Sequence, residues 1–192
     1  MALTTLAKVK SYLGIPTATT TDDDLITSFM NSSISFITQE TDQIFEPTTL
    51  TKYYGKDSVD GRKLLLDEYI QSVDTVTNGD TEETEIASSN YFLMPKNKNA
   101  FTEIWLTSSS IYSWEYDDSE GEFITIEGSF GLFSSVPTII EHTANRLTAY
   151  LYRQKDNHQD LDRAVVASSG VILPSSIPTD VLRVLKDYRK II

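Results

Sequence analysis

The apolar residues of this chain repeat with two different periods, and the change of period constrains the fold more than any other feature. Near the N-terminus, and again after Val136, they recur every three to four residues, which is typical of amphipathic helices. Between Leu50 and Phe130 short apolar runs alternate with polar turns, which is typical of strands. This order predicts an α+β fold, with a helical frame of two N-terminal and two C-terminal helices and a β-rich insertion of about 80 residues.

The same pattern predicts where the segments begin and end. We expect residues 1–48 to form the N-terminal helical part of the frame, residues 49–131 the β-rich insertion, and residues 132–192 the C-terminal helical part. Within the last segment, residues 155–178 are polar or small and include two prolines. We expect this stretch to be flexible and to order only against a partner.

Punctuation residues predict the ends of the two N-terminal helices. A first helix over Thr5–Leu13 should stop at Gly14, because glycine readily adopts the left-handed conformation that ends helices. Asp22–Asp24 should open the second helix as an N-cap with negative charge at the positive end of the helix dipole. The apolar positions continue to Ile44, so this helix is expected to end near Phe45–Pro47.

The two C-terminal helices have similar signals. Ser134 or Ser135 is expected to cap a helix that starts at Val136–Pro137 and ends near Gln154. Thr179 is expected to cap the last helix, whose apolar positions continue to Ile192.

Alternation indicates two paired strands in the β-rich block. Tyr112, Trp114 and Tyr116 would share one face of a strand, and Ile124 and Ile126 one face of the next. The polar stretch between them, residues 117–121, is expected to form the hairpin turn.

Composition excludes several kinds of protein. The chain has 192 residues, no cysteine and a net charge of -12. A disulfide scaffold, a thiolate metal site and a cysteine nucleophile are therefore excluded. Such a charge would not coat nucleic acid or an anionic membrane, no apolar run approaches the ~20 residues of a transmembrane helix, and the N-terminus does not have the pattern of a signal peptide.

Charge is distributed unevenly along the chain. Between Asp74 and Glu127 there are twelve acidic residues, and only Lys96 and Lys98 oppose them. From Arg146 to the end, basic residues outnumber acidic ones. The sequence therefore predicts an acidic middle and a mildly basic C-terminal part.

Each candidate for chemistry has a simpler structural interpretation. His142 and His158 stand without a nucleophile in a recognised arrangement and are expected at the surface. The acidic residues of 117–122 do not have the spacing of a calcium loop, and Gly128–Gly131 is interpreted as a strand exit rather than a phosphate loop. We therefore predict no catalytic, cofactor-binding or metal-binding residue, and expect a protein that is not an enzyme. A hydrolase would need a close pair of acids, one with a raised pKa, and the spacing shows none.

Three stretches together resemble a known family. Leu6–Ile15 followed by Asp22–Ile26 resembles the start of head–tail connector (adaptor) proteins of long-tailed bacteriophages, which typically begin with "V-K-x-Y-L-G-I … D-D-x-L-I". Phe123–Gly131 followed by Val136–Pro137 is similar to the strand, glycine turn and helix start of that family. Leu182–Lys190 resembles its last helix. The resemblance covers about half of the chain, and the long β-rich block looks like the insertion of larger relatives.

The resemblance implies a structural protein of the virion. Members form a ring of identical subunits, usually twelve, below the portal protein, where the ring extends the DNA channel and offers a docking surface to the next head-completion or tail protein. An acidic channel wall would let DNA pass without specific binding, since like charges repel. Assembly would take place in the host cytoplasm, and no membrane and no cofactor are implied.

We expect the C-terminal segment, residues 163–192, to dock on the portal, with Arg183, Tyr188, Arg189 and Lys190 at the partner interface. The alternative is a binding module of a tail or baseplate, in which the β-rich block recognises a glycan or a host-surface protein. That alternative predicts an exposed aromatic patch around Tyr112, Trp114 and Tyr116.

Overall fold

The computed structural model describes residues 3–154, 165–166, 172–173 and 177–190. In these residues the chain forms four α-helices and a six-stranded antiparallel sheet, which confirms the predicted α+β class. The chain divides into two compact units. The helical unit contains both ends of the chain, up to Gln43 and from Val136, and the β unit contains Ile44–Ser135.

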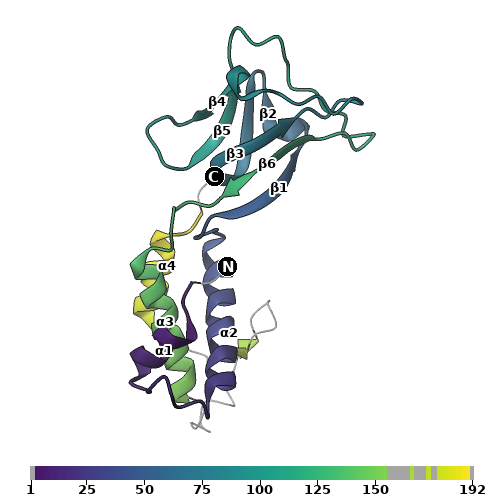
Figure 1. Ribbon diagram of the computed structural model, residues 1–192. Helices are drawn as coiled ribbons and strands as arrows, with labels where there is room; N and C mark the ends of the chain where they lie inside the picture. The colour runs from purple at the N-terminus through teal and green to yellow at the C-terminus, as the bar shows by residue number, and fades with distance from the viewer. Residues whose placement is uncertain (1–2, 155–164, 167–171, 174–176, 191–192) are drawn as a thin grey trace. The chain divides into compact units, whose positions relative to one another are not determined.

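The helical unit is built around its third helix. Its helices are α1 (Leu6–Leu13), α2 (Asp23–Thr41), α3 (Thr138–Gln154) and α4 (Thr179–Asp187) (Figure 1). α3 packs against each of the other three, so helices from the two ends of the chain share one core. The predicted apolar stripe of α3 is confirmed, because Ile140, Ala144 and Leu147 have no exposed surface and Leu151 is 5% exposed.

The ends of α1 are as predicted. The Thr5 hydroxyl accepts a hydrogen bond from the backbone N–H of Lys8, which satisfies one of the free donors of the first turn. Gly14 follows the helix with φ +75°, a conformation in which a side chain would cost energy. The backbone N–H of Gly14 donates to Ser11, and the helix ends there.

The second helix ends earlier than predicted, at Thr41 instead of near Phe45. Asp42 takes the left-handed conformation with φ +49°, and its N–H donates to the carbonyl of Thr38. Ile44 has helical spacing but packs against the core of the β unit, and Phe45 is fully buried with its ring 6.4 Å from that of Phe133. Burial against a different core therefore overrides the apparent continuation of the helical period.

Two predicted helix caps are wrong. α3 begins at Thr138, and the carbonyl of Pro137 accepts the backbone N–H groups of Ile140 and Glu141, so neither serine holds the cap position. α4 has Pro178 at its cap, and Thr179 is its first helical residue. The carbonyl of the residue before the helix accepts the first bond in both cases, and this needs no side-chain oxygen. The predicted continuation of the last helix toward Ile192 is also wrong, because α4 ends at Asp187 and Tyr188 holds its C-cap.

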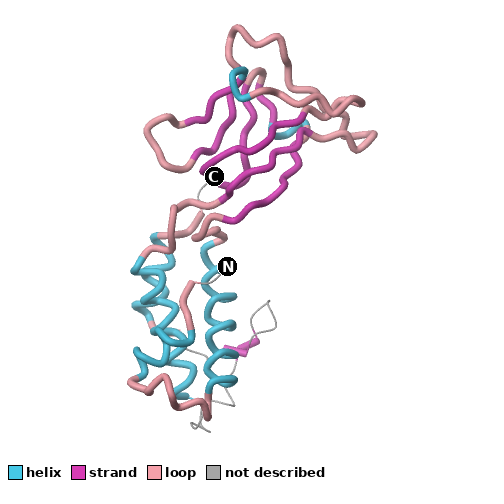
Figure 2. The backbone as a smooth tube through the Cα atoms, in the orientation of Figure 1, coloured by secondary structure: helices cyan, strands magenta, loops and turns pink. Residues whose placement is uncertain are grey.

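The β unit is one twisted antiparallel sheet (Figure 2). The connection between β4 and β5 is short, and the connection between β5 and β6 is a long loop. Its strands are β1 (Thr48–Tyr54), β2 (Val59–Asp60), β3 (Lys63–Thr77), β4 (Tyr91–Met94), β5 (Phe101–Leu106) and β6 (Ile124–Phe130), with 3-10 turns at Lys56–Ser58 and Ser88–Asn90. The strand order is β1-β6-β3-β5-β4, and β2 pairs with the start of β3. The outer strands of this order are therefore β1 and β4.

The long strand β3 covers two segments, 63–66 and 72–77, that the sequence pattern predicts as separate strands. It runs for 15 residues, and its register against β6 shifts between Ile70 and Ser72 and again between Val73 and Thr75. Gly128 of β6 lies opposite this irregular stretch, where a Cβ atom would stand 2.3 Å from the carbonyl oxygen of Ser72. The close approach of the two backbones requires glycine.

The predicted strand 111–116 is wrong. This segment pairs with no strand, and instead the buried side chain of Asn78 holds it, donating to the Ser113 carbonyl at 2.9 Å and accepting from the Glu115 N–H at 3.2 Å. The N–H of Gly79 also donates to Glu115. The predicted turn at 117–121 is present, closed by a single bridge between Asp117 and Glu122.

Beyond α3, two short segments are described. Val165–Val166 (β7) and Ile172–Leu173 (β8) pair as an antiparallel ladder. Most of the predicted flexible segment, 155–178, lies outside the described residues.

Candidate functional site

The predicted interface residues lie on α4 and directly after it. Arg183 is an exposed residue of the helix, Tyr188 is half-buried at its end, and Arg189 and Lys190 follow. The structure therefore brings the four residues to one end of the helical unit, but it gives them different environments.

Arg189 and Lys190 are tied to the end of α2. The guanidinium of Arg189 donates to the carbonyl of Glu40 at 3.1 Å and forms an ion pair with its carboxylate. The Lys190 ammonium lies 3.6 Å from the Asp42 carboxylate, and its backbone N–H donates to Thr41. Cations at this position are favourable because a helix C-terminus has partial negative charge. These two residues therefore hold α2 within the fold, and Arg183 is the predicted residue whose charge faces solvent.

A second ion pair joins α4 to α3. The guanidinium of Arg146 contacts the Asp180 carboxylate with two nitrogens, one of them at 3.0 Å. This hydrogen bond keeps the pKa of Asp180 below its ordinary value and raises the pKa of Arg146. Ile139 of α3 lines one hollow with this pair and is 45% exposed. Apolar surface next to a fixed charge pair is typical of protein interfaces.

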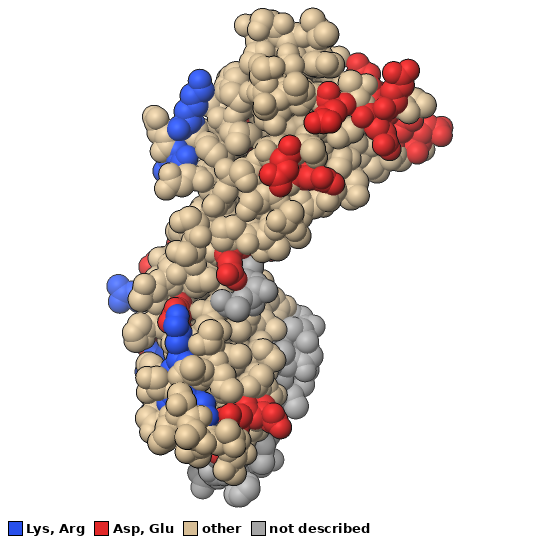
Figure 3. Space-filling view, viewed as in Figure 1, with Lys and Arg blue, Asp and Glu red and all other residues tan. Residues whose placement is uncertain are grey.

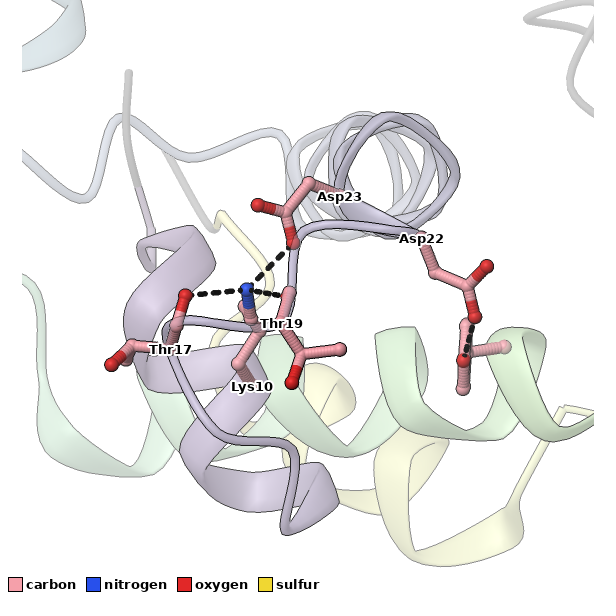
Figure 4. Close-up of polar contacts among 6 residues, drawn as sticks. Lys10, Thr17, Thr19, Asp22 and Asp23 are labelled. Atoms are coloured by element: carbon pink, nitrogen blue, oxygen red, sulfur yellow. Dashed lines mark hydrogen bonds and ion pairs between the residues drawn. The ribbon is translucent and has the colours of Figure 1, made fainter.

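Lys10 is a buried charge that the sequence analysis missed. Its side chain is 2% exposed, and the ammonium donates to the carbonyls of Thr17 and Thr19 and to Asp23 at 2.7 Å (Figure 4). All three ammonium protons therefore have partners, which is what makes burial of a charge tolerable. The carboxylates of Asp22 and Asp23 are both engaged, since Asp22 accepts from the hydroxyl of Tyr152. Asp22 holds the predicted N-cap position, and Asp23 and Asp24 lie in the first turn as predicted, but Asp22 makes no side-chain cap bond.

The β unit has an acidic groove of about 680 Å³ between its long loops and the strands β1 and β6. Carboxylates from three segments line it, namely Asp80, Glu83, Glu122 and Glu127. Tyr53, which is 66% exposed, and Phe123, which is 38% exposed, add aromatic surface at its rim. Gly79 lies beneath the groove so close to Phe123 that a Cβ atom would stand 2.6 Å from the backbone. A hydrogen bond from Thr84 lowers the pKa of Asp80, so its charge persists at neutral pH.

The opposite edge of the sheet carries a surface that we call the β4-edge face. Two cross-strand rows form it, Lys63–Trp105–Phe92 and Leu65–Glu103–Met94. Leu64 and Ile104 between these rows are fully buried, so strand alternation directs the two rows outward. The only sequence signal for this face is that alternation, and it does not by itself say which side of the sheet faces solvent.

The side chains of the β4-edge face stack on one another. The rings of Phe92 and Trp105 are 5.8 Å apart. The ammonium of Lys63 lies 4.6 Å from the Trp105 ring centre and that of Lys96 lies 4.8 Å from the Phe92 ring centre. The indole N–H of Trp105 donates to Glu103. The stacking orders two aromatic rings at the surface, and ordered aromatics are the residues that contribute most to protein interfaces.

The aromatic patch predicted around Trp114 does not form. Trp114 is 7% exposed, and it belongs to the buried core of the β unit. Tyr112 and Tyr116 are partly buried against the same core. An extended loop without strand pairing can place alternate side chains in a core, just as a paired strand does. Alternation in the sequence therefore does not distinguish a strand from such a loop.

The remaining candidates have no site geometry. His142 is exposed on α3 and meets the ring of Tyr12 edge-on at 6.1 Å. Asp117 accepts two bonds from Ser119 within its own turn, which also lowers its pKa. Within residues 3–154 and the short described segments after them, no group of three metal-binding side chains occurs. No helix in this described part of the chain has both the length and the apolar character that crossing a bilayer requires.

Comparison by sequence finds no relative: no protein-family model matches the chain, and no curated protein matches it. Comparison by structure does find relatives. A chain in "Neck of empty GTA particle computed with C6 symmetry" matches with a TM-score of 0.64 and 15% identity, covering 97% of this chain and 89% of that one. A chain in "Neck of native GTA particle computed with C12 symmetry" matches with a TM-score of 0.63 and 16% identity, covering 97% and 88%.

A third match is a chain in "Virion of native gene transfer agent (GTA) particle", with a TM-score of 0.60, 16% identity and coverage of 97% and 89%. Since both units of the chain are covered, the likeness is to the whole fold and not to the helical frame alone. At this identity it shows that the chain has the fold of those proteins.

Proposed function

We propose that the chain is a structural protein of a phage-like virion, a head–tail connector that forms a ring of twelve copies below the portal protein. In this role it extends the DNA channel and joins the head to the next head-completion or tail protein. The observation that carries the proposal is the likeness, over 97% of the chain, to chains in the neck of gene transfer agent particles. The resemblance of the sequence to connectors of long-tailed bacteriophages supports the same role independently.

A ring is the assembly that the relatives favour. The necks that contain them were computed with C6 and C12 symmetry, and a head-to-tail contact repeated around an axis closes such a ring. The net charge of -12 supports a channel through which DNA moves without binding, since like charges repel the phosphates. The protein would act in the virion after assembly in the host cytoplasm.

Portal docking is assigned to α4 and the chain around it. Arg183 and Lys186 are exposed on α4 and offer charge to a partner. Tyr188, Arg189 and Lys190 stay in the proposed interface, but their contacts with the end of α2 give the last two a role in folding as well. Arg183 is therefore the residue whose replacement tests docking without disturbing the subunit.

A non-catalytic role follows from the same proposal. A connector works by contact with copies of itself and with its neighbours, and this requires surfaces rather than a reaction centre. The alternative, a tail or baseplate module that binds a glycan or a host-surface protein, depended on an exposed aromatic patch, and Trp114 at its centre is 7% exposed. We therefore favour the connector.

Particles assembled with and without the chain test the proposal. Without it, we expect DNA-filled heads and complete tails that do not join, counted by electron microscopy. Adding the purified chain to an extract of such heads should restore joining, and a reconstruction of the neck should place it as a ring below the portal. Joined particles in the absence of the chain would contradict the proposal.

A further inference from the structure

The β unit has two flanks of opposite character. On one flank lie the β4-edge face and the β4–β5 connection, with Lys63, Lys96 and Lys98. On the other lies the acidic groove. On the face that Figure 3 shows, the basic atoms of this unit gather on the side of the β4–β5 connection, and most of the acidic atoms gather on the other side, over the long loops.

The basic flank has the features of a contact surface. β4 is the last strand of the sheet, with no strand paired to its outer edge among the described residues. Phe92 of β4 and Trp105 of β5 pack against each other with tilted rings, and Leu65 is 42% exposed. The one carboxylate of the face, that of Glu103, accepts a hydrogen bond from Trp105 and offsets only part of the lysine charge. An edge strand with ordered aromatics and excess positive charge is suited to an acidic protein surface.

The acidic groove complements that flank in shape as well as in charge. It is concave, whereas the β4–β5 connection with Lys96 and Lys98 is an exposed loop. Its rim offers Tyr53 and Phe123 to apolar and cationic side chains. Four carboxylates around one groove repel each other, and three lysines of a neighbour would relieve that repulsion.

Both flanks belong to one unit, so each copy carries one of each. A contact between unlike flanks repeats in one direction, and such a contact generates a ring when the rotation closes. We propose that the β4-edge face of one copy docks into the acidic groove of the next copy, making the β unit a second belt of contacts in the ring. This inference rests on the connector function proposed above, and it gives the β-rich insertion a role in assembly.

Charge reversal on each flank tests the contact. The first variant carries Lys96→Glu and Lys98→Glu, and the second carries Glu83→Lys and Glu122→Lys. All four side chains are in loops, and reversing them leaves the buried core untouched. Ring formation is measured by sedimentation and native mass spectrometry, for the chain alone and with the portal protein of the same particle.

Each variant by itself should assemble at least tenfold more weakly than the wild type. The first variant has two acidic flanks, and in the second variant two lysines cancel the charge of the remaining groove carboxylates, Asp80 and Glu127. An equal mixture of the two variants should assemble again, since each supplies the flank that the other lacks. A matched control, Lys8→Glu with Arg153→Glu, makes the same charge change at exposed positions of α1 and α3 and should leave contacts between copies as in the wild type.

The possible failures are distinguishable. A wild-type ring that both variants form equally well overturns the inference and leaves the connector function standing. A wild-type chain that forms no ring, alone or with the portal, contradicts both. Binding of labelled duplex DNA that the lysine variant loses would assign the basic flank to nucleic acid and would also overturn the inference.

Discussion

The ammonium of Lys10 lies 2.7 Å from the carboxylate of Asp23, and the lysine side chain is 2% exposed. This pair joins the second half of α1 to the start of α2. The ammonium also donates to the carbonyls of Thr17 and Thr19, which lie in the loop between the two helices. Lys8, two residues earlier in α1, makes an ion pair with Glu141 at the same distance, but its side chain is 54% exposed. The two pairs differ in burial and not in length, and burial decides what each contributes.

Replacement of Lys10 by methionine should therefore be costly. The change leaves Asp23 and two carbonyls without their donor, and we expect a loss of about 3 kcal/mol in the free energy of unfolding. The control Lys8→Met should lower the free energy of unfolding by less than about 1 kcal/mol, because water solvates the carboxylate that an exposed pair leaves behind when its partner is removed. Urea unfolding followed by circular dichroism measures both losses of stability. Equal losses for the two variants would contradict a larger contribution from the buried Lys10 pair.

Gly128→Ala should disrupt the contact between β3 and β6. The new methyl group would stand 2.3 Å from the Ser72 carbonyl oxygen, so one of two paired backbones must move. We expect a loss of about 2 kcal/mol or more, as for other overpacked sites. Gly61→Ala is the control, with no atom within 4 Å of its Cβ and only the cost of φ +60°, about 1 kcal/mol. A thermal midpoint for the Gly128 variant equal to that of the control would contradict the close approach.

The Arg146–Asp180 pair should make stability depend on pH at the acid end. Its hydrogen bond holds the pKa of Asp180 below the ordinary 3.8 in the folded chain. A depressed folded-state pKa means that the contribution is present above the unfolded-state pKa and is lost as pH falls through the folded-state value. Asp180→Asn should thus be less stable than the wild type at pH 7, and the difference should shrink as the pH falls from 3.8 to 2. A difference that stays constant between these pH values would sink this assignment.

Arg189 and Arg183 should separate folding from docking. Arg189→Glu places a carboxylate against that of Glu40 at the negative end of α2, so the melting temperature should fall. Arg183→Glu changes an exposed side chain and should leave the free energy of unfolding within about 0.5 kcal/mol. Binding to portal protein, measured by surface plasmon resonance, should nevertheless weaken for Arg183→Glu. Unchanged binding of the Arg183→Glu variant to portal protein would contradict the proposal that α4 docks there.

Local rules served best where one residue decides the structure. Gly14 ends α1 as expected, since only glycine adopts its conformation at low cost. The stripe of α3 is buried as its spacing predicts. The same rules wrongly predicted that α2 continues past Thr41 and that 111–116 forms a strand. Both errors arise because the spacing of apolar residues does not say which core their side chains will join.

The candidate surfaces were beyond the reach of sequence. Arg189 and Lys190 make ion pairs with the end of α2, and Tyr188 is half-buried. Arg183 is the predicted basic residue that makes none of the described ion pairs. The β4-edge face combines residues from three strands, and their adjacency depends on a register that spans more than forty positions of the chain.

The sequence by itself determined the order of the helical and β-rich segments, the net negative charge with its acidic middle, and the end of α1 at Gly14, because these depend on neighbouring residues and on composition. Only the tertiary structure decided that Lys10 is buried against Asp23, that Trp114 is in a core, and that lysines and carboxylates occupy opposite flanks of one sheet. The physical reason is that burial and charge pairing arise between residues distant in the chain, and which of them meet is settled by packing the whole fold.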